Sequence, residues 1–118
     1  MKKICVIGTG YVGLVSGVCF AEVGNTVLCH DIDSAKIKRL KLGRVPFYEP
    51  GLGALLKKNS MRGRIRFTTR LEEVLKEAEV IFVCVGTPPQ KTGEADLSIY
   101  FSVVRAIGRI FEKTKCTA

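Results

Sequence analysis

The chain has 118 residues, of which 47% are hydrophobic and 25% are charged, and its formal net charge is +8. This length fits one compact domain with a buried core, and the chain has no run of the roughly eighteen apolar residues that a membrane-spanning helix requires. Positive charge can serve nucleic acid, an anionic membrane or an anionic small ligand. The densest basic stretch, 57–70, has a single aromatic residue, Phe67, and not the repeated interleaving that would stack on bases. We therefore expect no nucleic acid as a partner and, with no membrane span, no membrane.

The N-terminal stretch "MKKICVIG" is not typical of a signal peptide, because Gly8 and Gly10 interrupt its short apolar run. We therefore expect a cytoplasmic protein. Five cysteines are spread along the chain, and no two lie within four residues of each other, so there is no zinc-type pair. Four lie in apolar runs, where we expect small buried side chains. These four are Cys5, Cys19, Cys29 and Cys84, and the fifth, Cys116, lies in a polar tail.

In chain order, the hydrophobic pattern predicts strands that alternate with helices. A strand at 2–8 leads into a helix at 11–24, and a strand at 26–31 leads into a helix at 34–43. After a loop come a short helix at 52–59, a strand at 64–68, a helix at 70–78 and an apolar strand at 80–86. The loop "TPPQKTGEAD" leads to a last helix at 97–113. Gly24 and Gly43 are expected to end their helices, and Asp96 to cap the last one.

The strands that are apolar on both faces predict a parallel sheet covered by helices on both sides. Right-handed crossovers then give a doubly wound, Rossmann-type α/β fold with strand order 3-2-1-4. The strand at 64–68 differs, because Arg64 and Arg66 alternate with Ile65 and Phe67 and predict one wet face. We expect residues 1–118 to form one domain.

The stretch "VIGTGYVG" joins the first strand to the first helix through Gly8, Gly10 and Gly13. In a dinucleotide-binding turn, the first glycine makes the tight bend and the second lets the backbone approach a pyrophosphate. The third lets the helix pack closely on the sheet, and the N–H groups at the helix start face the phosphates. The alternative is a tight strand-to-helix turn that binds nothing.

Asp31 ends the second strand eighteen residues after Gly13, close to the spacing of about 20 expected for a carboxylate that binds the adenosine ribose. A carboxylate there favours NAD and would repel the 2′-phosphate of NADP. Lys36 and Arg39 lie nearby and weaken that preference. The alternatives are an aspartate that merely ends a strand and a solvated Lys36.

Gly86 and Thr87 leave the end of the fourth strand. In a doubly wound sheet this is the switch point between strands one and four, where ligands bind. Gly86 permits close approach, and the Thr87 hydroxyl and backbone can hydrogen-bond a cofactor. An ordinary strand exit is the alternative.

Five motifs in order resemble those of the UDP-glucose 6-dehydrogenase family, and the related GDP-mannose dehydrogenases share much of the pattern. They are "VIGTGYVGLVSGVCFAEVGN", "DIDSAKI", "PFYEPGL", "GRIRFTT" and "VCVGTPPQKTGEADLS". The resemblance implies an NAD-dependent, four-electron oxidation of a sugar C6 hydroxyl to a carboxylate, with two NAD. The family NAD contacts carried over by position are Val12, Asp31, Lys36 and Thr87, with the glycine turn from Gly8 to Gly13, which includes Tyr11.

The chain departs from the family in length, because the motifs of the family's catalytic centre and sugar-nucleotide domain are not in it. We therefore expect the NAD-binding portion of a UDP-glucose 6-dehydrogenase, inactive alone, with none of the cysteines catalytic. The alternatives are a fragment of a GDP-mannose or other nucleotide-sugar dehydrogenase and a stand-alone dinucleotide-binding sensor module. The strand at 80–86 would lack its outer neighbour, so we also expect a homo-oligomer or self-association through this edge.

Overall fold

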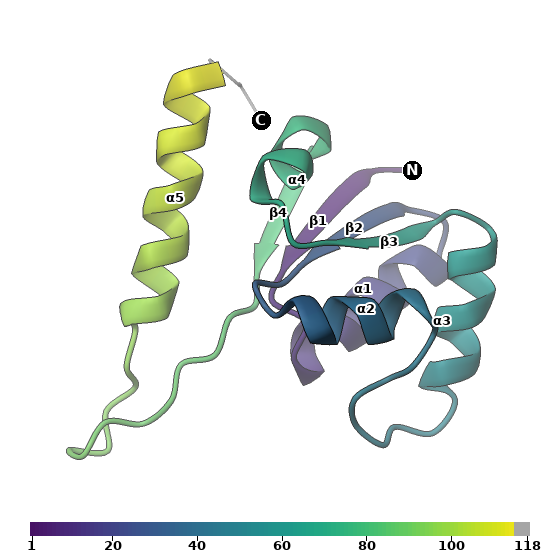
Figure 1. The fold of residues 1–118 in the computed structure, drawn as a ribbon, viewed down its shortest axis with the longest axis horizontal. Helices are drawn as coiled ribbons and strands as arrows, with labels where there is room; N and C mark the ends of the chain where they lie inside the picture. Colours follow the sequence, from purple (N-terminus) through teal and green to yellow (C-terminus); the bar gives the residue numbers. More distant parts are fainter. Residues whose placement is uncertain (115–118) are drawn as a thin grey trace.

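Four parallel strands form the centre of the computed structural model, which describes residues 1–114 (Figure 1). The strands are β1 (Lys3–Ile7), β2 (Thr26–His30), β3 (Ile65–Thr68) and β4 (Val80–Val83). Their order, β3-β2-β1-β4, confirms the predicted doubly wound fold. The helices are α1 (Tyr11–Glu22), α2 (Ser34–Lys41), α3 (Leu52–Met61), α4 (Leu71–Glu77) and α5 (Ser98–Thr114). Cys116 lies outside the described residues.

Alternation along β1 divides the core into two layers, one on each face of the sheet. Ile4 and Val6 face the layer that α1, α2 and α3 cover, whereas Cys5 and Ile7 face the layer that α4 and α5 cover. Since β1 is apolar on both faces, it lies between β2 and β4 in the middle of the sheet. Each fully buried aliphatic side chain in these layers contributes about 1.5–3 kcal/mol through its removal from water.

The outer strand β3 has the predicted wet face. Ile65 and Phe67 are buried against the first layer, and Arg66 is exposed on the other side, where its guanidinium pairs with the Glu77 carboxylate of α4. This alternation places β3 at the sheet edge, where one face needs no apolar cover.

The predicted helix ends are found at glycines with left-handed backbone. The Gly24 N–H donates to the Ala21 carbonyl at 3.0 Å, and the Asn25 N–H donates to the Phe20 carbonyl at 3.1 Å, which together close α1 in a Schellman motif. At the other end of the chain, the Asp96 carboxylate accepts from the Ser98 N–H at 2.9 Å and so holds the start of α5.

The predicted end of the fourth strand was wrong. The strand ends at Val83 rather than at residue 86, because β1, its only partner among the described strands, turns away at Gly8. The expected loop after β4 also contains a short antiparallel bridge between Pro89 and Ala95.

The predicted burial was also wrong for two of the cysteines. Cys19 is exposed, because α1 directs Val18 and Ala21 at the sheet and leaves Cys19 on the solvent side. Cys84 is only partly buried, because it follows the last paired residue of β4.

No helix within residues 1–114 is long and apolar enough to cross a bilayer.

Replacing Gly13 by alanine should destabilise the fold by about 3 kcal/mol or more. An added Cβ would lie 1.9 Å from the Gly8 carbonyl oxygen, so α1 or the preceding turn must move. The matched control is Gly53→Ala in α3, where an added Cβ meets nothing within 4 Å and φ is not positive. That variant should gain roughly 0.5–1 kcal/mol, because alanine favours the helix. Urea unfolding of both variants measures the difference, and equal stabilities would contradict the packing argument.

Candidate functional site

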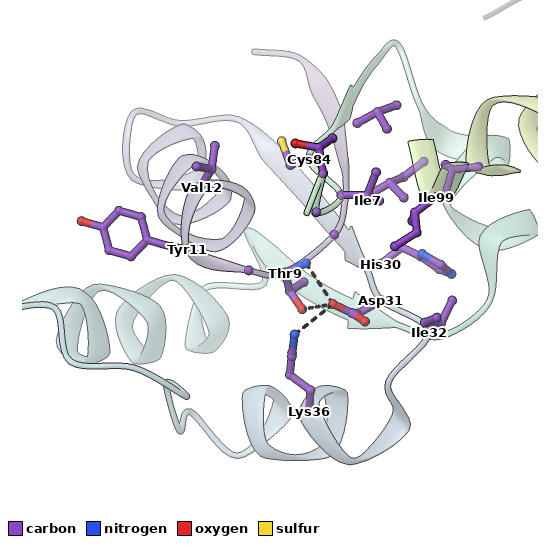
Figure 2. Close-up of a pocket in the computed structure, with 17 residues that line it drawn as sticks. Ile7, Thr9, Tyr11, Val12, His30, Asp31, Ile32, Lys36, Cys84 and Ile99 are labelled. Atoms are coloured by element: carbon purple, nitrogen blue, oxygen red, sulfur yellow. Dashed lines mark hydrogen bonds and ion pairs between the residues drawn. The ribbon is translucent and has the colours of Figure 1, made fainter. Parts of the chain in front are cut away.

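A cavity of about 710 Å³ lies at the carboxyl ends of the strands. It is lined by the turn between β1 and α1, the end of β2, the chain that leaves β4 and the first turns of α5 (Figure 2). On one side of β1 the sheet continues with β2 and β3, which come next in the chain. On its other side lies β4, which comes last. The cavity therefore lies at the switch point of the sheet, where doubly wound folds bind ligands.

The three glycines of the β1–α1 turn meet three different requirements. Gly8 has φ +102°, and an added Cβ would lie 2.5 Å from the Cys84 carbonyl oxygen. Gly13 supports the close contact of α1 with the Gly8 carbonyl. At Gly10, by contrast, an added Cβ would meet nothing within 4 Å, although this residue lines the cavity. The space above Gly10 is therefore open to a ligand and would be filled by a side chain.

The N-terminus of α1 opens onto this space. Gly10 is the N-cap and offers no side chain to the helix, whose first turn contains no acidic residue. The first backbone hydrogen bond within the helix runs from the Leu14 N–H to the Gly10 carbonyl at 2.9 Å. The N–H groups of Gly10, Tyr11 and Val12 precede that bond, and these three residues line the cavity. Unpaired N–H groups and the helix dipole create a positive potential there that suits an anion.

Asp31 brings a carboxylate to the same cavity from just beyond the end of β2 (Figure 2). Its Oδ2 accepts from the Thr9 hydroxyl at 2.7 Å and from the Thr9 N–H at 3.0 Å, and its Oδ1 accepts from the Asp33 N–H at 3.0 Å. Partial burial by itself would raise the pKa of the Asp31 carboxyl. The hydrogen bonds from Thr9 and Asp33, with the nearby Lys36 ammonium, outweigh burial, so this pKa lies below its usual value. Asp31 is therefore held ionised.

Lys36 reaches the cavity from the first turn of α2. The Asp33 side chain accepts from the Lys36 N–H at 3.1 Å and caps the helix at this point. The Lys36 Nζ lies 3.5 Å from Asp31 Oδ2. On the opposite wall, Gly86 and Thr87 line the cavity from the chain beyond β4. Eight of the nine sequence-predicted site residues thus line one cavity, and the ninth, Gly13, lies behind the turn.

Tyr11 lines the cavity, but its ring points away from Asp31 and Lys36 (Figure 2). The hydroxyl donates to Glu49 Oε2 at 2.8 Å, and the ring centroid lies 5.2 Å from that of Phe47. The bond to the Glu49 carboxylate raises the pKa of Tyr11. This side chain therefore ties the α2–α3 loop to the N-terminus of α1.

Several residues of the cavity wall were not predicted from the sequence. Thr9 is the most informative, because it is fully buried and holds Asp31 with two donors. A hydroxyl residue between two glycines of the turn was the available signal. His30, Cys84 and the isoleucines Ile32 and Ile99 also line the cavity. In the sequence, these four residues are typical of core or surface positions, and none of them indicates a binding site.

The model of the UDP-glucose/GDP-mannose dehydrogenase family, NAD binding domain, matches residues 2–117. The chain belongs to this family. It is 54% identical over 108 residues to the UDP-glucose 6-dehydrogenase TuaD of Bacillus subtilis, a match covering 92% of this chain and 23% of that protein. It is 39% identical over 112 residues to the GDP-mannose 6-dehydrogenase of Pseudomonas putida, covering 95% and 26%.

Solved structures agree with the sequence comparison. A ternary complex of GDP-mannose dehydrogenase from Pseudomonas aeruginosa superposes with a TM-score of 0.89 at 39% identity, covering 94% of this chain and 25% of that one. A UDP-glucose dehydrogenase from Pyrobaculum islandicum gives the same TM-score and identity, covering 94% and 26%. The chain spans about a quarter of the length of these relatives. It is an NAD-binding domain of the dehydrogenase family, as the motifs of the sequence predicted.

His30, the single histidine of the chain, should make the fold less stable below about pH 6.5. Burial lowers the pKa of this imidazole, and the opposing effects of the Thr69 backbone, Asp31 and Glu72 are smaller. The unfolded chain therefore takes up the proton first as the pH falls through 6.5, and the free energy of unfolding decreases. Urea unfolding between pH 5 and 8 measures this, and His30→Asn should flatten the curve in that window. An unchanged slope in the variant would show that another group is responsible.

Proposed function

We propose that NAD binds in the cavity at the switch point and that the chain is the cofactor-binding portion of a UDP-glucose 6-dehydrogenase. One observation carries the proposal. The ionised Asp31 and the N-terminus of α1 line the same cavity, with the open space of Gly10 beside them. An anion-binding helix end next to a carboxylate suits a pyrophosphate joined to a ribose.

Each predicted residue has a part in this proposal. The N–H groups of Gly10, Tyr11 and Val12 would bind the pyrophosphate, and Gly8 and Gly13 give the turn its shape. Asp31 would accept hydrogen bonds from the adenosine ribose, with Lys36 beside it. Gly86 and Thr87 would line the cofactor from the opposite wall. Bound NAD supplies a hydride acceptor, and the residues of this chain hold and orient it.

The substrate of the whole protein is proposed from its relatives. Four bacterial relatives named as UDP-glucose 6-dehydrogenases are 45–54% identical to this chain, whereas two GDP-mannose 6-dehydrogenases are 39–40% identical. We therefore favour UDP-glucose, whose C6 hydroxyl would be oxidised to a carboxylate as two NAD are reduced. GDP-mannose is the second candidate. The cytoplasmic location expected from the sequence stays a prediction, which cell fractionation tests.

The activity is tested with the complete reading frame. NADH formation should be faster with UDP-glucose than with GDP-mannose at equal concentration, and the 118-residue chain alone should form none. A preference for GDP-mannose would overturn the choice of substrate. If the complete protein forms no NADH with either sugar, the proposed reaction is wrong.

Isothermal titration calorimetry of the chain should show that NAD binds at least about tenfold more tightly than NADP. Two like charges about 4 Å apart repel by roughly 1 kcal/mol in water and about 4 kcal/mol near a protein surface, so Asp31 should reject the 2′-phosphate. Gly10→Val should abolish binding, because its side chain would fill the open space above the turn. Gly53→Ala is the control and should bind as the wild type does. Equal binding of NADP, or full binding by Gly10→Val, would contradict the proposed site.

We also propose that the chain associates with a second copy through the β4 edge. Among the described residues, β4 pairs with β1 on one side and with no strand on the other. Val80 and Phe82 are exposed there, and the stretch 80–85 has neither charge nor proline. Such an edge offers unpaired backbone groups to another strand. Leu97, Tyr100, Phe101 and Val104 of the α5 segment are also exposed.

Light scattering across a salt series tests the association. Because the chain carries a net charge of +8, association should increase with salt as repulsion is screened to about 8 Å at physiological ionic strength. Val80→Lys should reduce it by placing a charge on the edge. Val23→Lys adds the same charge at an exposed position outside the sheet and is the control. A wild-type monomer in high salt, or equal effects of both lysines, would exclude the edge as the interface.

A further inference from the structure

Thr9 lies between two glycines of the β1–α1 turn, yet it has no exposed surface. A buried hydroxyl needs a partner, and a neighbouring backbone carbonyl would satisfy it as well as a carboxylate. The Thr9 hydroxyl instead donates to Asp31 Oδ2 at 2.7 Å, and the Thr9 N–H donates to the same oxygen at 3.0 Å. Two donors from one residue thus hold one oxygen of the carboxylate.

This arrangement makes the two oxygens of Asp31 unequal. Oδ2 receives both Thr9 donors and lies 3.5 Å from Lys36 Nζ, whereas Oδ1 receives one donor, the Asp33 N–H. Each carboxylate oxygen can accept about two hydrogen bonds. Oδ2 is therefore fully engaged by the protein, and Oδ1 keeps an acceptor position for a ligand.

We propose that Thr9 is a positioning residue for cofactor choice: its hydroxyl fixes the Asp31 carboxylate so that Oδ1 faces a ribose hydroxyl and the charge cannot turn away from a 2′-phosphate. This inference rests on the proposed NAD site. Loss of the hydroxyl removes the shorter of the two Thr9 bonds to Oδ2 and leaves the Thr9 and Asp33 N–H groups to hold the carboxylate, so its position loosens and its hold on Lys36 weakens. The carboxylate then accepts less well from ribose, and Lys36 can pair with a 2′-phosphate.

The test compares NAD and NADP binding by calorimetry in Thr9→Val, Thr9→Ala and Thr9→Ser. Thr9→Val keeps the volume without the hydroxyl. It should weaken NAD binding about tenfold, which corresponds to one hydrogen bond from the ribose to the Asp31 carboxylate. NADP binding should stay constant or improve. Thr9→Ala covers the case in which the valine variant does not fold. Thr9→Ser retains the hydroxyl and should restore the wild-type preference for NAD.

Thr68→Val is the matched control. The Thr68 hydroxyl is also buried and donates to a carboxylate, Glu73 Oε2, at 2.6 Å, but Thr68 does not line the cavity. This variant should lose stability and keep the wild-type ratio of NADP to NAD dissociation constants. In an Asp31→Asn background, Thr9→Val should no longer change that ratio, because the carboxylate on which it acts is gone.

The outcomes separate this inference from the proposed function. If the wild type prefers NAD and the Thr9 variants weaken NAD and NADP equally, Thr9 is merely structural and the inference is wrong, while the proposed function stands. The inference is equally wrong if Thr9→Val changes the ratio in the Asp31→Asn background. If the wild type binds no NAD, the proposed site and this inference fall together.

Discussion

The close passage of two backbone segments at the β1–α1 turn is the constraint on which the rest of the structure depends. Gly8 lies against the Cys84 carbonyl of the chain leaving β4, and Gly13 lies against the Gly8 carbonyl. No side chain fits at either point. This contact brings the N-terminus of α1 to the end of the sheet and sets β4 beside β1. The cavity is the space that remains beyond the contact.

The electrostatics of the site follow from that geometry rather than from the net charge. The chain is strongly basic, but the groups that meet in the cavity are a helix N-terminus and a single carboxylate, with Lys36 beside it. Thr9 and Asp33 provide donors that stabilise the carboxylate in its partly buried position. A ligand with negative phosphates at one point and hydroxyl groups at the next complements this order of charges.

Patterns that depend on periodicity were predictable from the sequence. The strand order and the two-sided cover of the sheet followed from apolar strands that alternate with helices, and the glycine spacing located the turn. The end of β4 was not predictable, because Cys84 and Val85 continue the apolar run of the strand and only the turning away of β1 ends the pairing. Thr9 and the Tyr11–Glu49 pair were missed because hydrogen bonds between distant segments leave no periodic signal.

The two layers of the core give the halves of the cavity different resistance to local unfolding. The turn and Asp31 belong to the part of the chain where α1, α2 and α3 share one large cluster. Ile99 and Val103, however, come from α5, which joins the smaller cluster through a few side chains at the end of an extended loop (Figure 1). We therefore expect amide protons of α5 to exchange with solvent through local openings that leave the sheet intact. Because residues of both halves line the cavity, a ligand that fills it would contact α5 as well as the turn, and slower exchange in that helix should report occupancy of the cavity.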